Sequence, residues 1–361
     1  MTVTILQGDV RAVLATLPAD HFDCCVTSPP YFGLRDYGVE GQIGLEPTLS
    51  GYLETMVGVC REVHRVLKPE GTFWLNIGDS YAANRGYQVE QTKGGPKHGP
   101  AQAAGGRTAK ASDHGLKPKD LMMVPNRLAI LLQEDGWYVR SEIIWNKPNP
   151  MPESVTDRPT SAHEKVWLLT KSERYFYDAD AIREKESVPD WDNGSRVFGG
   201  KNKAGANAQH GERTTGRVAV ARKRGLPPRH MQHETCDRSS LDEVPRGGGR
   251  NARNVWTIAT RPFKEAHFAT MAPDLAERCI KAGCPMGGNV LDPFGGAGTT
   301  GMIAQRNGRH ATLIEINPEY IEIASARIDE DAMGPTSRAA ARAARKGASA
   351  PGGLFEQADS A

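Results

Sequence analysis

One stretch near the C-terminus constrains the fold of this chain more than any other, because it runs from a strand through a glycine loop into a helix. Residues 289–300 read Asn-Val-Leu-Asp-Pro-Phe-Gly-Gly-Ala-Gly-Thr-Thr. Glycines let the backbone approach a ligand closely, and a helix N-terminus favours an anion, so this pattern is typical of sites for nucleotide-like cofactors. The structural alternative is a glycine loop that only packs against its neighbours.

The surroundings of this loop indicate what kind of cofactor it would take. Glu315 follows Gly296 by nineteen residues, at the end of the next predicted strand, where a carboxylate can accept hydrogen bonds from both ribose hydroxyls. The loop lacks the G-x-G-x-x-G spacing and a G-K-S/T step, and Asp292 would repel a pyrophosphate. A carboxylate beside the loop suits a ligand that bears an amino group, and S-adenosylmethionine fits this requirement.

A second motif, Thr27-Ser28-Pro29-Pro30-Tyr31, follows the apolar run 22–26. The two prolines fix φ and remove two backbone donors, which predicts a stiff turn whose carbonyls point outward and are not paired by a strand. The serine hydroxyl and these carbonyls are acceptors, and the tyrosine ring is a stacking surface. Together they could hold a planar group with an exocyclic amine, although a Pro-Pro strand terminator with an incidental tyrosine is the other interpretation.

Hydrophobic periodicity predicts strands that alternate with helices, which implies a mainly parallel, doubly wound sheet. The predicted strands cover residues 2–6, 22–26, 72–77, 137–145, 166–169, 289–291 and 310–316. The predicted helices cover residues 10–17, 49–67, 121–134, 299–307 and 318–331. Pro69-Glu70-Gly71 is expected to end the second helix before the next strand begins.

Basic charge gathers in two stretches that are rich in glycine and proline. The balance of Lys and Arg over Asp and Glu is +5 in residues 84–119 and +6 in residues 183–253, whereas the whole chain carries only +2. Such loops suit a polyanion, with phosphates as the default target, and solvated inserts are the alternative. We expect 84–119 to be a flexible insert and 335–361 to be a flexible tail.

Composition describes a soluble globular protein with 39% hydrophobic and 24% charged residues. No apolar run is long enough to span a bilayer, and charged residues interrupt the first thirty positions, so we expect a cytoplasmic protein without a membrane contact. The six cysteines form no C-x-x-C pair and have no histidine partners at zinc spacing. We therefore expect buried, reduced thiols and no metal site.

With both motifs in view, the chain closely resembles the DNA amino-methyltransferases of the N4-cytosine/N6-adenine type. Thr-Ser-Pro-Pro-Tyr matches the catalytic motif of that family, and Asp-Pro-Phe-Gly-Gly-Ala-Gly-Thr-Thr matches its cofactor loop. The catalytic motif comes first and a basic region separates the two, which resembles the β class. The resemblance covers most of 1–82, 119–180 and 254–330, and includes Gly8-Asp9, the stretch 145–152 and His267-Phe268-Ala269.

The resemblance implies a Rossmann-like, S-adenosylmethionine-dependent methyltransferase fold of the α/β class with an inserted basic DNA-recognition region. Residues 1–182, with the insert 84–119, would form the catalytic part of the methyltransferase domain. Residues 183–253 would form the target-recognition region, and residues 254–334 the cofactor-binding part of the same domain. The partners implied are double-stranded DNA, a second copy in a homodimer, and a cognate restriction endonuclease.

The resemblance also assigns roles to residues. The target base would be flipped out of the duplex, Tyr31 would stack on it, and Ser28, with the carbonyl of Ser28 or Pro29, would accept hydrogen bonds from its amine. Asp292, Phe294 and Gly296 would line the methionine part of the cofactor, and Glu315 would hold the ribose. Asp9 would face the adenine or ribose, or would equally serve as a helix cap. The catalytic set is Ser28, Pro29, Pro30 and Tyr31, and the cofactor set is Asp9, Thr27, Asp292, Phe294, Gly296, Gly298, Thr299 and Glu315.

The first position of the catalytic motif suggests the base. Serine there resembles the cytosine-N4 enzymes and aspartate the adenine-N6 enzymes, but a neutral hydroxyl suits either amine, so adenine-N6 stays open. Carbon-5 methylation would need a catalytic cysteine in a Pro-Cys step, and the chain has none. The order of the motifs argues against an RNA or protein amine methyltransferase, and an inactive DNA-binding protein would not need both motifs intact.

Overall fold

The computed structural model describes residues 1–34, 36, 38–82, 115–185, 248–261 and 270–333. Its strands are β1 (Val3–Gln7), β2 (Phe22–Thr27), β3 (Leu67–Ile77), β4 (Tyr138–Asn146), β5 (His163–Thr170), β6 (Val255–Thr257), β7 (Asn289–Asp292) and β8 (His310–Glu315). Its helices are α1 (Val10–Thr16), α2 (Leu49–Val66), α3 (Val124–Glu134), the short 3-10 helix η3 (Asp180–Ile182), α5 (Pro273–Gly283), α6 (Thr299–Arg306) and α7 (Pro318–Ala332).

The strands form one eight-stranded sheet in the order β1-β8-β7-β2-β3-β5-β4-β6. All neighbours are parallel except that β5 runs antiparallel to both β3 and β4, so the prediction of a mainly parallel sheet is confirmed. From β7 the chain winds outward through β8, and from β2 it winds the opposite way through β3. The winding therefore reverses between β7 and β2, which is the position where doubly wound sheets bind ligands at the carboxyl ends of their strands.

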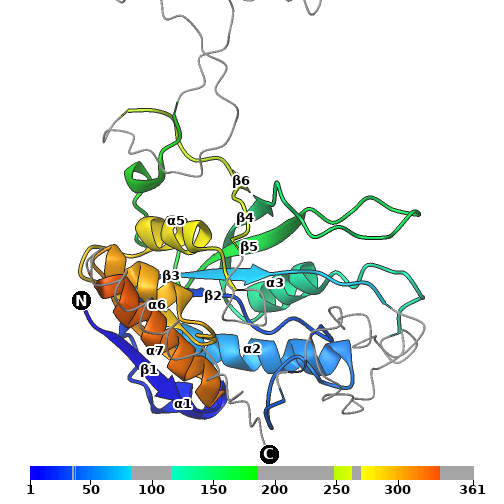
Figure 1. The fold of residues 1–361 in the computed structure, drawn as a ribbon, viewed down its shortest axis with the longest axis horizontal. Helices are drawn as coiled ribbons and strands as arrows, with labels where there is room; N and C mark the ends of the chain where they lie inside the picture. Colours follow the sequence, from blue (N-terminus) through cyan, green and yellow to red (C-terminus); the bar gives the residue numbers. More distant parts are fainter. Residues whose placement is uncertain (35, 37, 83–114, 186–247, 262–269, 334–361) are drawn as a thin grey trace, which may run out of the picture.

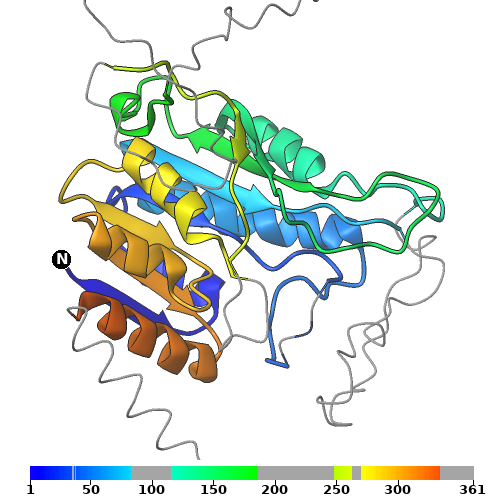
Figure 2. The ribbon, with the colours of Figure 1, turned by 45° about the horizontal axis from the view of Figure 1, so that its top comes forward.

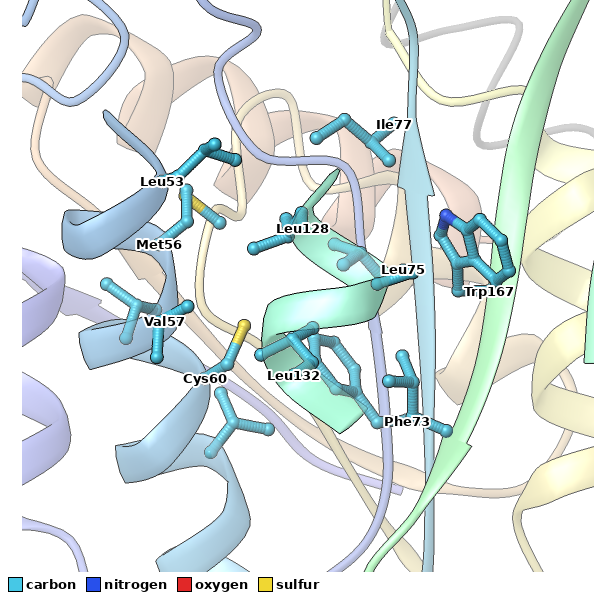
Figure 3. Close-up of a cluster of buried hydrophobic side chains, with 14 of the residues drawn as sticks. Leu53, Met56, Val57, Cys60, Phe73, Leu75, Ile77, Leu128, Leu132 and Trp167 are labelled. Atoms are coloured by element: carbon cyan, nitrogen blue, oxygen red, sulfur yellow. The ribbon is translucent and has the colours of Figure 1, made fainter. Parts of the chain in front are cut away.

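Helices cover both faces of this sheet (Figures 1 and 2). On one face α2 and α3 pack against alternate residues of β3, among them Phe73, Leu75 and Ile77 (Figure 3). Trp74 points to the opposite face, where α5, α6 and α7 pack. This alternation follows from the two-residue period of a strand, and it buries β3 on both sides.

The join between α2 and β3 differs from the prediction. The strand begins at Leu67, directly after the helix, and not at Thr72. Leu67 pairs with Phe22 while Thr72 pairs with Cys24, so the ladder contains a register shift that absorbs the extra residues. Pro69-Glu70-Gly71 lies in this irregular part, where a residue without an N–H donor does not break a regular ladder.

Helix α5 has no counterpart in the prediction. Pro273 occupies its first turn, and Leu275, Ala276, Cys279 and Ile280 are buried at a spacing of three and four. The pattern is helical, but alanine and cysteine make it weakly apolar, and the helix is short. Its end at Gly283 packs so closely on Thr72 and Trp74 that a Cβ there would lie 2.2 Å from the Trp74 ring nitrogen.

Several predictions concern segments that lie wholly or partly outside the described residues. These are most of the basic insert 84–119, most of the target-recognition region 183–253, residues 267–269 and the tail 335–361. Within the described part of the chain, the cysteines are free and buried, as expected; they are Cys24, Cys25, Cys60, Cys279 and Cys284. Among the helices described, none has the length and apolar character needed to cross a membrane.

Candidate active site

The carboxyl ends of four neighbouring parallel strands bring the predicted site residues into one row. In sheet order, Asp9 follows β1, Glu315 ends β8, Asp292 ends β7 and Thr27 ends β2. Parallel strands present their carboxyl ends at the same edge, so residues from both ends of the chain become neighbours there.

A buried hydrogen bond joins the two motifs. The Thr27 hydroxyl donates to Oδ1 of Asp292 at 2.6 Å, although the two residues are 265 positions apart. The same oxygen accepts the backbone N–H of Phe294 at 3.0 Å. Burial raises the pKa of Asp292 to about 6, and the hydrogen bonds from Thr27, Thr300 and Phe294 oppose that rise. Asp292 is thus an acceptor held in place where the winding of the chain reverses, between β7 and β2.

Glu315 lies beside the glycine loop with acceptor capacity to spare. Its Oε2 accepts the N–H of Gly296 and its Oε1 accepts the N–H of Asn317, each at 2.8 Å. Burial raises the pKa of this carboxyl above its usual range. A carboxylate offers about four lone-pair sites, so each oxygen can accept a further hydrogen bond. This arrangement fits the two hydroxyls of a ribose.

Two glycines of the loop, Gly296 and Gly298, differ in what surrounds them. Gly296 has φ +48°, and a Cβ added there would meet nothing closer than the Phe294 carbonyl oxygen at 3.9 Å. Gly298 has φ +74°, and a Cβ there would lie 2.9 Å from that of Ala324 in α7. The Thr299 hydroxyl accepts from Arg327 of the same helix at 2.8 Å. Gly296 is therefore open to a ligand, whereas Gly298 and Thr299 fix the loop to α7.

The glycine loop and its neighbours form a site that fits S-adenosylmethionine. The site combines open backbone at Gly296, a buried carboxylate at Asp292 and spare acceptors at Glu315. Glu315 would hold the ribose, and Asp292 would face the amino end of the cofactor. Bound there, S-adenosylmethionine supplies an activated methyl group on its sulfonium.

Asp9 has the structural role that sequence reasoning left open. It is the N-cap of α1 and accepts from the Arg11 backbone N–H at 2.8 Å. The side-chain hydrogen bond from Arg11 lowers the pKa of Asp9. Gly8 donates to the Glu315 carbonyl at 3.0 Å, which keeps this cap beside the cofactor loop.

At the other end of the row, the serine-proline turn places Tyr31 in a defined position. The Tyr31 hydroxyl donates to Oε2 of Glu164 at 2.6 Å, and Ser28 Oγ lies 3.4 Å from the same hydroxyl. The ring passes so close to Gly78 that a Cβ on that residue would lie 2.6 Å from Tyr31 Cε2. Burial, followed by the charge of Glu164, raises the pKa of Tyr31 well above its usual value.

The carbonyls of the turn are not all directed outward, contrary to the prediction. The carbonyl oxygen of Pro30 accepts a hydrogen bond from the Tyr52 hydroxyl of α2 at 2.9 Å. Tyr52 is fully buried, so its hydroxyl needs a partner, and the turn supplies one. Among the described residues, none donates a hydrogen bond to the carbonyl of Ser28 or Pro29, and these are the two acceptors assigned to the amine.

The Glu164 carboxylate beside the turn has polar partners that the sequence patterns did not predict. Oε2 of Glu164 also accepts from Asn76 Nδ2 at 3.1 Å, and Oε1 forms an ion pair with Lys147. Two features of the sequence could have pointed to these residues. Lys147 lies within residues 145–152, a stretch that resembles the DNA amino-methyltransferases, and Glu164 precedes the apolar run of β5. Neither feature connects them to Tyr31, because only the packing of β3, β4 and β5 places Glu164, Asn76 and Lys147 together.

Several known proteins are similar to this chain over most of its length. Residues 22–326 match the sequence model of the N6_N4_Mtase family, described as DNA methylase. The chain is 42% identical over 326 residues to the type II methyltransferase M.Cfr9I of Citrobacter freundii, covering 90% of this chain and 87% of that protein. It is 40% identical over 324 residues to M.SmaI of Serratia marcescens, covering 90% of each.

Solved structures share the fold at low sequence identity. The PvuII DNA methyltransferase (cytosine-N4-specific) has a TM-score of 0.54 at 18% identity, covering 91% of this chain and 86% of that one. TTHA0409 of Thermus thermophilus, complexed with S-adenosyl-L-methionine, has a TM-score of 0.52 at 22% identity, covering 92% and 96%. The predicted methyltransferase fold is confirmed. The chain therefore belongs to the N6_N4_Mtase family of DNA methylases and is a DNA methyltransferase whose methyl donor is S-adenosylmethionine.

Proposed function

We propose that this DNA methyltransferase transfers the methyl group to the exocyclic N4 amine of a cytosine that has been flipped out of double-stranded DNA. The observation that carries the proposal is the Thr27–Asp292 hydrogen bond, because it holds the amine-accepting turn next to the cofactor loop. The choice of cytosine rests on Ser28, which stands where the adenine-N6 enzymes of the family typically have aspartate.

The turn supports this chemistry through its acceptors. The lone pair of an exocyclic amine is delocalised into the ring, so the amine is a poor nucleophile until acceptors favour a tetrahedral nitrogen. Ser28 Oγ and the carbonyl of Ser28 or Pro29 would accept its N–H groups and stabilise the positive charge that develops on nitrogen. Tyr31 would stack on the base. Alignment of the amine with the sulfonium methyl group would supply the rest of the rate acceleration.

The proposal also gives cofactor-binding roles to residues at the ends of β1, β8 and β7, at the same edge of the sheet. Asp292, with Phe294 and Gly296, would hold the methionine part, and Glu315 would accept from the ribose hydroxyls. Asp9 would lie toward the ribose or adenine while it caps α1. Gly298 and Thr299 would act by holding the loop against α7.

For the whole chain, we propose that 1–182 and 254–334 form one methyltransferase domain, and that 183–253 reads the DNA target. Lys and Arg of 84–119 and 183–253 would contact phosphates. The relatives are named type II methyltransferases, which supports a place beside a cognate restriction endonuclease in the cytoplasm. A homodimer is proposed from the family resemblance alone.

The test is to identify the modified base. Protein is incubated with S-adenosylmethionine labelled in its methyl group and unmethylated genomic DNA, which is then digested to nucleosides. We expect labelled N4-methylcytosine, and labelled N6-methyladenine would overturn the cytosine assignment. Ser28→Ala should bind the cofactor and lose most methyl transfer. Single-molecule sequencing of DNA from cells that express the protein would give the recognised sequence.

A further inference from the structure

The Glu164 carboxylate is a meeting point for three donors from three segments of the chain. It accepts from Tyr31 at 2.6 Å and from Asn76 at 3.1 Å, and it pairs with Lys147. Only 17% of the Glu164 side chain and 18% of the Lys147 side chain is exposed. The Lys147 ammonium also lies 4.5 Å from the centre of the Trp145 ring. A largely buried charge pair is favourable only when further hydrogen bonds support it, and here Tyr31 and Asn76 supply them.

This arrangement fixes the direction of the hydrogen bonds at the catalytic turn. A tyrosine hydroxyl has one proton, and that of Tyr31 is directed to Glu164. Toward Ser28, 3.4 Å away, the Tyr31 oxygen can then only accept. The proton of the Ser28 hydroxyl is therefore directed to Tyr31, and the lone pairs of Ser28 Oγ are left for another donor.

The opposite direction would leave the turn unsuited to an amine. If Tyr31 donated to Ser28, it would occupy a lone pair of Ser28 Oγ, and the serine proton would be free to point at the substrate. An exocyclic amine presents N–H groups, so it needs an acceptor at this position. The charge of Glu164 excludes the reversed arrangement, because a carboxylate accepts hydrogen bonds and does not donate them.

We propose that Glu164 is a positioning residue of the methyl transfer, which acts through Tyr31 and makes Ser28 an acceptor for the target amine. The proposal rests on the role given to Ser28 in the proposed function, and it holds for either exocyclic amine. Polarisation along the chain from Ser28 to Tyr31 to Glu164 also increases the negative potential at Ser28 Oγ as positive charge develops on the nitrogen.

The test is a double-mutant cycle of single-turnover methyl transfer with Glu164→Gln, Tyr31→Phe and the double variant. A glutamine can donate to the Tyr31 oxygen and release its proton toward Ser28. We expect each single variant to slow transfer about tenfold or more, with dissociation constants for S-adenosylmethionine and DNA within about twofold of the parent. The double variant should be as slow as Tyr31→Phe, because Glu164 acts only through that hydroxyl.

Glu142→Gln is the matched control. Glu142 forms an ion pair with Lys165 at 2.5 Å, its side chain is 41% exposed, and no hydrogen bond or ion pair joins that side chain to Ser28, Tyr31 or Glu164 in the described part of the chain. This variant should keep the parental rate. An unchanged rate in Glu164→Gln, or losses that multiply in the double variant, would overturn the proposal. If Glu164→Gln does not fold, Tyr31→Phe decides, since it leaves the ion pair intact: a slowed transfer with intact binding supports the proposal, and a parental rate overturns it.

Failure of the proposed role of Glu164 can be distinguished from failure of the proposed function. A product of N6-methyladenine would remove the cytosine assignment, while the rate ratios of the cycle would still decide the role of Glu164. N4-methylcytosine formed at the parental rate by Glu164→Gln would leave the function standing and remove only the positioning role.

Discussion

Thr27 donates a 2.6 Å hydrogen bond to Asp292, and this contact connects the catalytic turn to the cofactor loop across 265 positions of sequence. The two residues end β2 and β7, which are adjacent in the sheet. Adjacency in the sheet does not depend on which strand comes first in the chain. The family's motifs can therefore occur with the catalytic turn first, as they do here, and still form one site.

Thr27→Val should destabilise the protein, because it removes one donor to a buried carboxylate. The substitution keeps the shape of the side chain, so the lost hydrogen bond is the main change. We expect a loss of about 1–3 kcal/mol in the free energy of unfolding, together with weaker binding of S-adenosylmethionine. Urea denaturation and isothermal titration would measure both. Thr4→Val, at an exposed threonine of β1, is the control and should change neither; equal behaviour of the two variants would argue against the importance of the contact.

Cofactor binding should depend on pH through Asp292, whose pKa is raised by burial to about 6. Its contribution to the stability of the free protein is present at low pH and is lost as the pH rises through about 6, because the folded state favours the protonated form. A cationic ligand favours the ionised form, so affinity for S-adenosylmethionine should rise about tenfold between pH 5 and pH 7.

Titration calorimetry at several pH values checks this dependence on Asp292. The pH step should be much smaller in Asp292→Asn, which keeps an acceptor for Thr27 but has no charge to titrate. A step of the same size in both proteins would assign the effect to another group.

Glu315→Ala should weaken binding of S-adenosylmethionine by at least about tenfold, since it removes the acceptors for two hydroxyls. Glu315→Gln keeps one acceptor and should be affected less. Glu319→Ala, at an exposed position in the first turn of α7, is the control. Unchanged affinity in Glu315→Ala would show that the cofactor assignment is wrong.

Gly78→Ala should reduce methyl transfer more than it reduces cofactor binding. Its Cβ would lie 2.6 Å from Cε2 of Tyr31, so the ring must shift and its hydrogen bond to Glu164 is disturbed. Gly58→Ala is a matched control, because Gly58 lies within α2 and a Cβ there meets nothing within 4 Å. That variant should be active and about 0.5–1 kcal/mol more stable. Parental rates in Gly78→Ala would mean that the position of Tyr31 is not critical.

DNA affinity should fall steeply as salt rises, because the two basic stretches of the sequence, 84–119 and 183–253, suit phosphate contacts. A plot of log affinity against log salt concentration, measured by fluorescence anisotropy, should have a slope of several units. Affinity for S-adenosylmethionine serves as the internal control and should change little. A nearly flat slope for DNA would argue against binding by these stretches.

The alternation of elements and both motifs could be predicted from the sequence, since each depends on local features. These are the period of apolar residues, the glycines of the loop and the proline pair. Prediction from the sequence failed where local signals conflict with packing. Pro69-Glu70-Gly71 predicts a break, but pairing of β3 with β2 carries the strand through it with a shift of register. Helix α5 has few large apolar residues, and its place is decided by the face of the sheet that it covers.

The polar residues around the catalytic turn could not be predicted from the sequence, because they are brought there by the packing of the sheet. Glu164, Lys147 and Asn76 belong to different segments, and no spacing in the chain connects them to Tyr31. They meet because β5 runs antiparallel between β3 and β4, which brings its first residues to the edge where β2 and β3 end. Sequence patterns thus identify the residues that local geometry requires, whereas the direction of a hydrogen-bond chain depends on partners that only the folded sheet brings into contact.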